Sequence, residues 1–241
     1  MNITVINGEQ MFYATAAERI AEQMRNKPAS VIGFSTGRTT SGIHAELAKI
    51  YNRQPFDTSK LTVFAVDEIT NMPRECPASC YYLIYNDVVK PLNIPMENFI
   101  MPDPMADDIE AECLRYENAV NSRGQVDLLE LGLGENGHLG FNQPGTPFDS
   151  SARLSWMEEQ LHDRLCKQYD IDTTIPFGAL TLGIKNIMLC RKILLVANGS
   201  NKADVVERLA TGRITTDLPC SILSLHPNCD CLLDELAAVA L

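Results

Sequence analysis

Short apolar runs alternate with longer amphipathic segments along almost the whole chain. Apolar runs bounded by glycine, proline or polar residues predict buried strands, and apolar residues spaced three and four apart predict helices. We expect strands at 3–6, 30–34, 61–66, 99–101, 126–131, 192–197, 222–225 and 231–233. We expect helices at 10–24, 39–51, 81–89, 107–121, 160–169 and 199–210, and a short helix or turn at 181–188. This alternation predicts an α/β fold with a mostly parallel sheet and helices on both faces.

The length and the even composition of the chain indicate a single domain. A chain of 241 residues can form one large α/β domain, and no shift in composition marks a linker. The apolar runs are too short to span a bilayer. Residues 1–7 lack the basic region and apolar stretch of a signal peptide. We therefore predict one domain over 1–241 that acts in the cytoplasm without a membrane partner.

The charge balance narrows the class of partner. The chain has 20 basic and 31 acidic residues and a formal net charge of −11, which argues against nonspecific binding to nucleic acid. The net charge does not exclude an anionic small molecule as a ligand, because backbone N–H groups and one or two cations can outweigh the global charge within a pocket. The eight cysteines and four histidines lack the spacing of a zinc site, so we expect reduced thiols and no metal.

A glycine-rich segment at 132–145 follows the predicted strand 126–131. The carboxyl end of a strand is where an open α/β sheet places its ligand. Glycine lets the backbone approach a ligand closely, and His138 can move a proton near neutral pH. The segment therefore predicts a site, the alternative being a glycine-rich connection with an incidental histidine.

A second polar segment, STGRTT at 35–40, joins a predicted strand to a predicted helix. Its hydroxyls, its free N–H groups and Arg38 suit a phosphate at a helix N-terminus. The alternative is an ordinary helix start capped by Thr39 or Thr40. The segment is not a Walker loop, because the Gly-Lys-Ser/Thr ending is absent.

Charged residues follow two further predicted strands. Asp67 and Glu68 end the strand at 61–66, and side chains alternate along a strand, so one carboxylate is expected to face a pocket. A carboxylate in a partly dry cleft can have a raised pKa and take a proton from carbon. Lys202 adds a cation at the start of a predicted helix. The alternatives are a surface acidic turn and a surface lysine.

Five segments in this order carry a resemblance to a known family: 35–40, 64–68, 134–144, 199–203 and 225–227. The chain resembles the glucosamine-6-phosphate deaminase/isomerase family over nearly its whole length, and especially its shorter bacterial members, which are proposed to act on amino-hexose 6-phosphates such as galactosamine 6-phosphate. The resemblance implies a Rossmann-like three-layer α/β/α fold and no cofactor.

The implied reaction opens a pyranose ring, moves a proton from C2 to C1 and releases ammonia to give a ketohexose 6-phosphate. The substrate is then a phosphorylated amino sugar, glucosamine 6-phosphate or galactosamine 6-phosphate, and the protein belongs among isomerases, deaminases and hydrolases of amino-sugar metabolism. A homo-oligomer is compatible with this assignment.

The resemblance also assigns roles to single residues. Asp67 resembles the base that takes the C2 proton, and His138 resembles the acid/base that opens the ring. The residues that the resemblance places against the substrate and its phosphate are Thr36, Gly37, Arg38, Thr39, Glu68, Gly134, Gly137 and Lys202.

The chain departs from the family pattern next to the histidine. The best-known members carry an aspartate at the position of Asn136 and a glutamate at that of Gln143, and these carboxylates orient the histidine and help it carry positive charge. We count both amides among the catalytic residues, although an amide cannot stabilise imidazolium by charge. Arg38 replaces a small residue and can add a bidentate phosphate contact or narrow the pocket.

Two alternative functions follow from these departures. Gln143 motivates a non-catalytic or weakly catalytic sugar-phosphate-binding protein. The other alternative is an isomerase or lactonase acting on a different sugar phosphate. The related 6-phosphogluconolactonases usually continue the glycine-rich turn with a Ser-Leu-Phe-Pro-like stretch, whereas FNQP stands here at 141–144.

Overall fold

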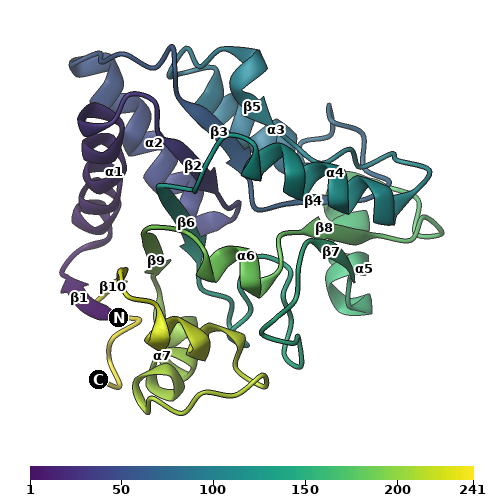
Figure 1. The fold of residues 1–241 in the computed structure, drawn as a ribbon. Helices are drawn as coiled ribbons and strands as arrows, with labels where there is room; N and C mark the ends of the chain where they lie inside the picture. The colour runs from purple at the N-terminus through teal and green to yellow at the C-terminus, as the bar shows by residue number, and fades with distance from the viewer.

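A seven-stranded parallel sheet forms the centre of the molecule (Figure 1). The computed structural model describes residues 1–241, apart from the side chains of 160 and 161. The strand order is β1-β10-β9-β6-β2-β3-β5. The strands are β1 (Asn2–Ile6), β2 (Val31–Phe34), β3 (Thr62–Ala65), β5 (Phe99–Ile100), β6 (Leu128–Gly132), β9 (Ile193–Ala197) and β10 (Cys229–Asp234). This sheet confirms the predicted α/β class.

Helices cover both faces of the sheet and give the predicted three layers. On one face α1 (Glu9–Asn26), α2 (Arg38–Arg53) and α3 (Cys80–Ile84) pack in one apolar cluster with side chains of the strands. A π-helical turn, Tyr85–Val89, continues α3. On the other face α4 (Ile109–Asn121), α6 (Ile184–Met188) and α7 (Ala203–Ala210) pack in a second cluster. The strand residues are therefore apolar in runs rather than in alternation, as expected of a sheet buried on both faces.

A second, antiparallel sheet lies beside the first and was not predicted. It consists of β4 (Asp67–Ile69), β8 (Gly178–Thr181) and β7 (Arg153–Trp156), in that order. With α5 (Glu159–Tyr169) it lies on the right in Figure 1. These strands have three or four residues each, too few for a period-two pattern to stand out.

One predicted strand is wrong. Residues 222–225 belong to a 3₁₀ helix, Pro219–Leu225, and not to the sheet. Pro219 stands at its first turn, where the fixed backbone angle of proline suits a helical start. A short apolar run has no periodicity of its own, so the nearby proline was the more informative residue.

The order of the strands reverses between β2 and β6. From β2 the chain continues through β3 to β5 on one side, and from β6 through β9 to β10 on the other. In open α/β sheets ligands bind at such a switch point, beyond the carboxyl ends of the strands. The segments that follow β2, β3, β6 and β9 are the four that carried the predicted site residues.

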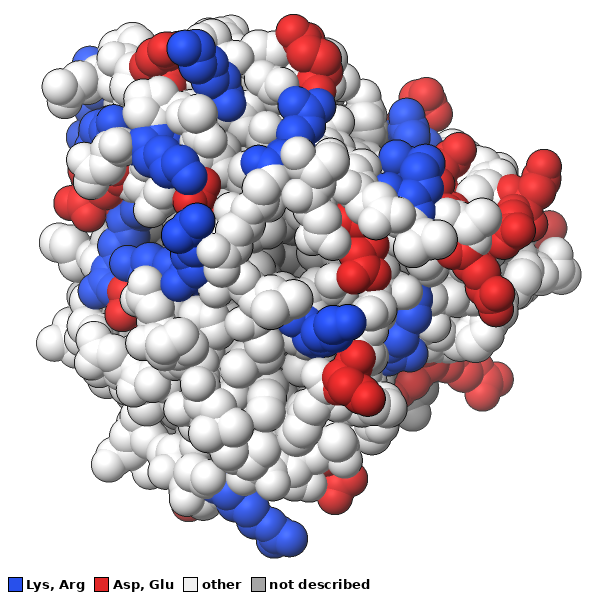
Figure 2. Space-filling view, viewed as in Figure 1, with Lys and Arg blue, Asp and Glu red and all other residues white. Residues whose placement is uncertain are grey.

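Charged side chains of both signs are interspersed over the face shown in Figure 2. In the part of the chain that the structure describes, no helix has the length and apolar character needed to cross a membrane.

Candidate active site

Hydrogen bonds tie the three loops at the switch point to one another. The Ser35 hydroxyl, after β2, accepts from the N–H of Gly132 at 3.0 Å. The Thr39 hydroxyl donates to Oδ1 of Asn198, which follows β9, at 2.6 Å. The loops that end three neighbouring strands therefore form one connected edge, as their positions in the sequence predicted.

The segment 35–40 forms the uncapped start of a long helix. Gly37 is the N-cap of α2 and provides no side-chain cap, and the Thr40 hydroxyl donates back to the carbonyl of Gly37 at 3.1 Å. The Thr39 hydroxyl is engaged elsewhere, so the alternative in which Thr39 or Thr40 caps the helix does not apply. The first N–H groups of an uncapped helix, at the positive end of its dipole, are suited to an anion.

Lys202 is close enough to Arg38 in this helix start and to His138 for their charges to interact. It ends a short 3₁₀ helix, Ser200–Lys202, directly after β9. Burial and the nearby charge of Arg38 lower its pKa, while Glu135 opposes that shift. The charge of Lys202 in turn lowers the pKa of His138. Lys202 and the exposed Arg38 therefore make the site electropositive inside an acidic protein.

The glycine-rich turn holds the His138 ring against its own backbone. A Cβ atom at position 134 would lie 2.4 Å from three ring atoms of His138, so only glycine fits beneath the imidazole. Gly137 has φ of +87°, a conformation that glycine adopts without strain. Gly134 and Gly137 are thus brought to the site by their backbone, because they shape the turn that presents the histidine.

A chain of two amides orients the imidazole. The oxygen Oδ1 of Asn136 lies 2.7 Å from Nδ1 of His138 and 3.1 Å from its backbone N–H. The amide nitrogen of Asn136 donates to Oε1 of Gln143 at 3.0 Å. Since Oδ1 can only accept, Nδ1 carries the proton, and Nε2 of neutral His138 keeps a free lone pair.

The environment of His138 favours the neutral ring. Burial, followed by the charge of Lys202, lowers its pKa to about 4. The amides of Asn136 and Gln143 carry no charge, so they cannot offset this lowering of the pKa. His138 is therefore suited to begin a reaction as a proton acceptor.

We expect the substitution Asn136→Asp to raise the pKa of His138 by about one to three units, because a carboxylate bonded to Nδ1 favours the imidazolium form. The imidazole titration followed by NMR measures this shift, with the signals of His44, His162 and His226 as internal references. An unchanged titration would contradict the hydrogen-bond assignment at Nδ1.

Asp67 approaches the same turn from the second sheet. It begins β4, pairs with Thr181 of β8 and is 4% exposed. A Cβ atom at position 140 would lie 3.0 Å from its Oδ2, so the carboxylate rests against Gly140, two residues beyond the histidine. Burial raises its pKa to about 6, and a hydrogen bond from the Cys80 thiol partly opposes this rise.

Glu68 points away from Asp67 and is engaged within the protein. One of its oxygens accepts from the N–H groups of Ile69 and Cys80, both at 2.8 Å, and the other from Tyr81 at 2.7 Å. Burial raises its pKa to about 7, against these hydrogen bonds. The two carboxylates point in opposite directions, as the alternation of side chains along a strand predicts. Asp67 faces the glycine-rich turn that bears His138, and Glu68 anchors the start of α3.

Two connecting residues of the site had no distinctive sequence pattern. Asn198 joins Thr39 to Tyr13, whose hydroxyl accepts from the Asn198 amide at 3.0 Å. Cys80 touches Asp67. Only the Asn-Gly pair that ends the strand at 192–197 could have pointed to Asn198. The family resemblance also implies one basic residue at about 164–167 that clamps the phosphate, and both Arg164 and Lys167 are exposed on α5.

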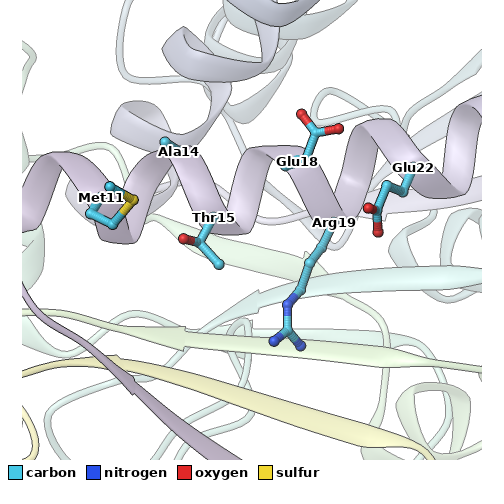
Figure 3. A pocket seen from close by; sticks show the side chains of 6 residues that line it. All are labelled: Met11, Ala14, Thr15, Glu18, Arg19 and Glu22. Carbon is cyan, nitrogen blue, oxygen red and sulfur yellow. The ribbon is translucent and has the colours of Figure 1, made fainter.

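A shallow groove along α1 lies outside this constellation. It is lined by residues of one helix only: Met11, Ala14, Thr15, Glu18, Arg19 and Glu22 (Figure 3). The Arg19 guanidinium turns toward the strands and pairs with Asp230 of β10 at 2.9 Å. The groove contains none of the predicted site residues.

The fold and the loops at its switch point place the protein among Rossmann-like α/β proteins with a ligand site beyond the carboxyl ends of the strands. Residues 8–231 match the family described as glucosamine-6-phosphate isomerases/6-phosphogluconolactonase, and the chain belongs to this family. The predicted resemblance is thereby confirmed.

Relatives that match over their full length indicate which members of this family the chain is similar to. The chain is 37% identical over 238 residues to a glucosamine-6-phosphate deaminase of Clostridium botulinum (strain Hall), covering 99% of this chain and 98% of the relative. A deaminase of the same name from Clostridium acetobutylicum is also 37% identical over 238 residues, with 99% of each chain covered. A solved monomeric glucosamine-6-phosphate deaminase superposes with a TM-score of 0.94 at 32% identity, over 100% of both chains.

These relatives confirm an isomerase/deaminase and correct one expectation. The predicted hydrolase class is wrong, because the full-length relatives are named deaminases and the family model names isomerases first. A 6-phosphogluconolactonase from Trypanosoma cruzi superposes with a TM-score of 0.78, over 100% of this chain and 96% of the lactonase. At 17% identity this similarity shows the shared fold alone.

Proposed function

We propose that the protein converts an amino-hexose 6-phosphate, either glucosamine 6-phosphate or galactosamine 6-phosphate, into a ketohexose 6-phosphate and ammonia. The observation that carries this proposal is the meeting of three groups at one sheet edge: an uncapped helix start with two cations, a neutral histidine and a buried carboxylate. Each matches one requirement of the reaction: holding the phosphate, opening the ring and moving the carbon-bound proton.

The phosphate binds at the start of α2 in this proposal. The backbone of Thr36, Gly37 and Thr39 surrounds it, and Lys202 and Arg38 neutralise its charge. An anchored phosphate fixes the sugar carbons relative to the turn that bears His138. The reacting atoms are then held in a defined orientation relative to the imidazole.

Ring opening is assigned to His138. Its Nε2 takes the proton of the anomeric hydroxyl and returns it to the ring oxygen as the C1–O5 bond breaks. Asn136 and Gln143 contribute by fixing the tautomer that leaves Nε2 free.

The carbon-bound proton is assigned to Asp67. The ionised carboxylate takes the proton from C2 of the open-chain sugar, which forms an enolamine, and delivers it to C1, which forms an imine at C2. Water then supplies the ketone oxygen as ammonia leaves. A pKa near 6 keeps Asp67 ionised at neutral pH and makes it a stronger base than an exposed carboxylate.

Ammonia release tests the proposal. Glucosamine 6-phosphate and galactosamine 6-phosphate are compared in parallel, with the non-aminated hexose 6-phosphates as controls for simple isomerisation. Release from one amino sugar supports the proposal and identifies the substrate. Thermal stabilisation by both compounds without release would instead favour the non-catalytic sugar-phosphate-binding alternative that Gln143 suggested.

We also propose that the enzyme works in the cytoplasm, which the eight free cysteines support, because reduced thiols persist there. Homo-oligomerisation stays a prediction for this chain, whereas the solved deaminase at 32% identity is described as monomeric. Light scattering of the purified protein distinguishes the two states.

A further inference from the structure

The Cys80 thiol lies between the phosphate loop and the base. Its sulfur is 3.3 Å from Oδ1 of Asp67 and 3.3 Å from the hydroxyl oxygen of Thr36. Cys80 is 3% exposed and opens α3, where Glu68 accepts from its backbone N–H. The thiol is therefore held in place by the helix start and is not a mobile surface group.

The direction of these hydrogen bonds follows from their chemistry. An ionised carboxylate only accepts, so the single S–H of Cys80 points to Asp67. The sulfur then has no hydrogen left for Thr36, and the Thr36 hydroxyl donates to the sulfur. The result is a directed chain from the phosphate loop through Cys80 to the base.

The chain also orients the carboxylate. Oδ1 of Asp67 is occupied by the thiol, whereas Oδ2 is the oxygen that faces Gly140 in the turn bearing His138. A carboxylate held by one oxygen presents the other in a fixed direction. The free oxygen therefore lies on the side where ring opening is proposed.

We infer that Cys80 is a positioning residue for proton abstraction: it aims Oδ2 of Asp67 at the sugar and couples the base to the phosphate loop through Thr36. This inference rests on the proposed function of Asp67. It adds a residue to which neither the family resemblance nor the sequence pattern assigned a role.

The groups near the Asp67 carboxylate explain why one weak donor matters. Glu68 is acidic and lies next to it in the chain, and the Tyr116 hydroxyl from α4 donates to the carbonyl of Ala65. Thr181 of β8 lies on the same face, and its hydroxyl oxygen is 3.3 Å from the carbonyl of Leu182. Among the residues that the structure describes, Cys80 is the one that donates a hydrogen bond to the Asp67 carboxylate.

Two substitutions at position 80 test the inference through the pH profile. Cys80→Ala removes the donor, and we expect the acid limb of kcat/KM to move up by about half to one pH unit, so that activity near pH 6 falls several-fold. Cys80→Ser keeps a donor and is expected to restore the wild-type limb. Cys76→Ala, in the segment before α3, is the matched control and is expected to behave as wild type.

Infrared spectroscopy of the S–H stretch gives a readout that does not need turnover. The band lost in Cys80→Ala is expected to shift as Asp67 titrates, and to stay fixed with pH in Asp67→Asn. An acid limb unchanged in Cys80→Ala, or an S–H band insensitive to Asp67, would overturn the inference. A wild-type protein without ammonia release would overturn the proposed function instead, and the infrared band would still report on the hydrogen bond.

Discussion

Replacement of Asp67 by asparagine is expected to lower exchange of the C2 proton with solvent by at least 10²-fold, while a hexose 6-phosphate still binds. Asparagine keeps the shape of the side chain but cannot accept a proton, and a positioned base contributes about 10²–10⁴-fold to such a step. Deuterium incorporation from heavy water measures the exchange, and ligand-induced thermal stabilisation measures the binding. Exchange retained in Asp67→Asn would remove Asp67 from the mechanism.

The same substitution has an expected effect on stability. The pKa of Asp67 is raised from 3.8 to about 6 in the folded protein, so the folded state prefers the protonated carboxyl. Stability from this preference is present below pH 4 and is lost as the pH rises through 6, which amounts to about 3 kcal/mol at pH 7.

Asparagine is neutral throughout this range. We therefore expect Asp67→Asn to be more stable than the wild type at pH 7 and to lose that advantage near pH 4. Denaturant unfolding at the two pH values tests this. A variant less stable at both would show that Asp67 is not strained by burial.

Replacement of His138 by glutamine is expected to lower turnover of the cyclic amino sugar by about 10²–10⁴-fold, because the proposed mechanism uses its Nε2 to carry the proton from O1 to O5. The proton transfer between C2 and C1 takes place on the open-chain sugar and uses Asp67. The variant should therefore lose less activity in C1 proton exchange on a ketose 6-phosphate, which measures that later step.

The pH profile separates the two groups. Burial lowers the pKa of His138 to about 4 and raises that of Asp67 to about 6, so we expect the enzyme ionisation in the acid limb of kcat/KM to be that of Asp67. His138→Gln is expected to reduce the rate and leave this limb in place. A limb that disappears in His138→Gln would assign the ionisation to the histidine and contradict the neutral amide chain.

The main sheet was predictable because its strands are buried on both faces. Runs such as those in β3 and β9 are continuously apolar, and parallel strands that alternate with helices leave few other arrangements. The second sheet was not predictable in the same way. Its strands β7 and β8 are short, and the pairing of β8 with β4 depends on contacts across more than one hundred residues of chain.

The predicted site residues came mainly from loops at strand ends, where glycine and polar residues stand out. The supporting residues did not stand out, because their roles depend on partners distant in the sequence. Cys80 acquires its role from Asp67 and Thr36, and Asn198 acquires its role from Thr39 and Tyr13. Glu68 shows the converse: its place at a strand end suited it to a ligand, and the structure shows it accepting from backbone N–H groups at the start of α3.

The reversal of strand order between β2 and β6 also governs when the protein can first bind anything. Ser35 and Gly132, which join the two sides of the reversal, are 97 residues apart, and Thr39 and Asn198 are 159 apart. In a chain growing on the ribosome, the start of α2 therefore lacks Lys202, its partner at the proposed anion site, until β9 and the residues that follow it have emerged. Since a ligand stabilises only the state that binds it, we expect sugar phosphate to protect the protein against proteolysis only once this site is complete.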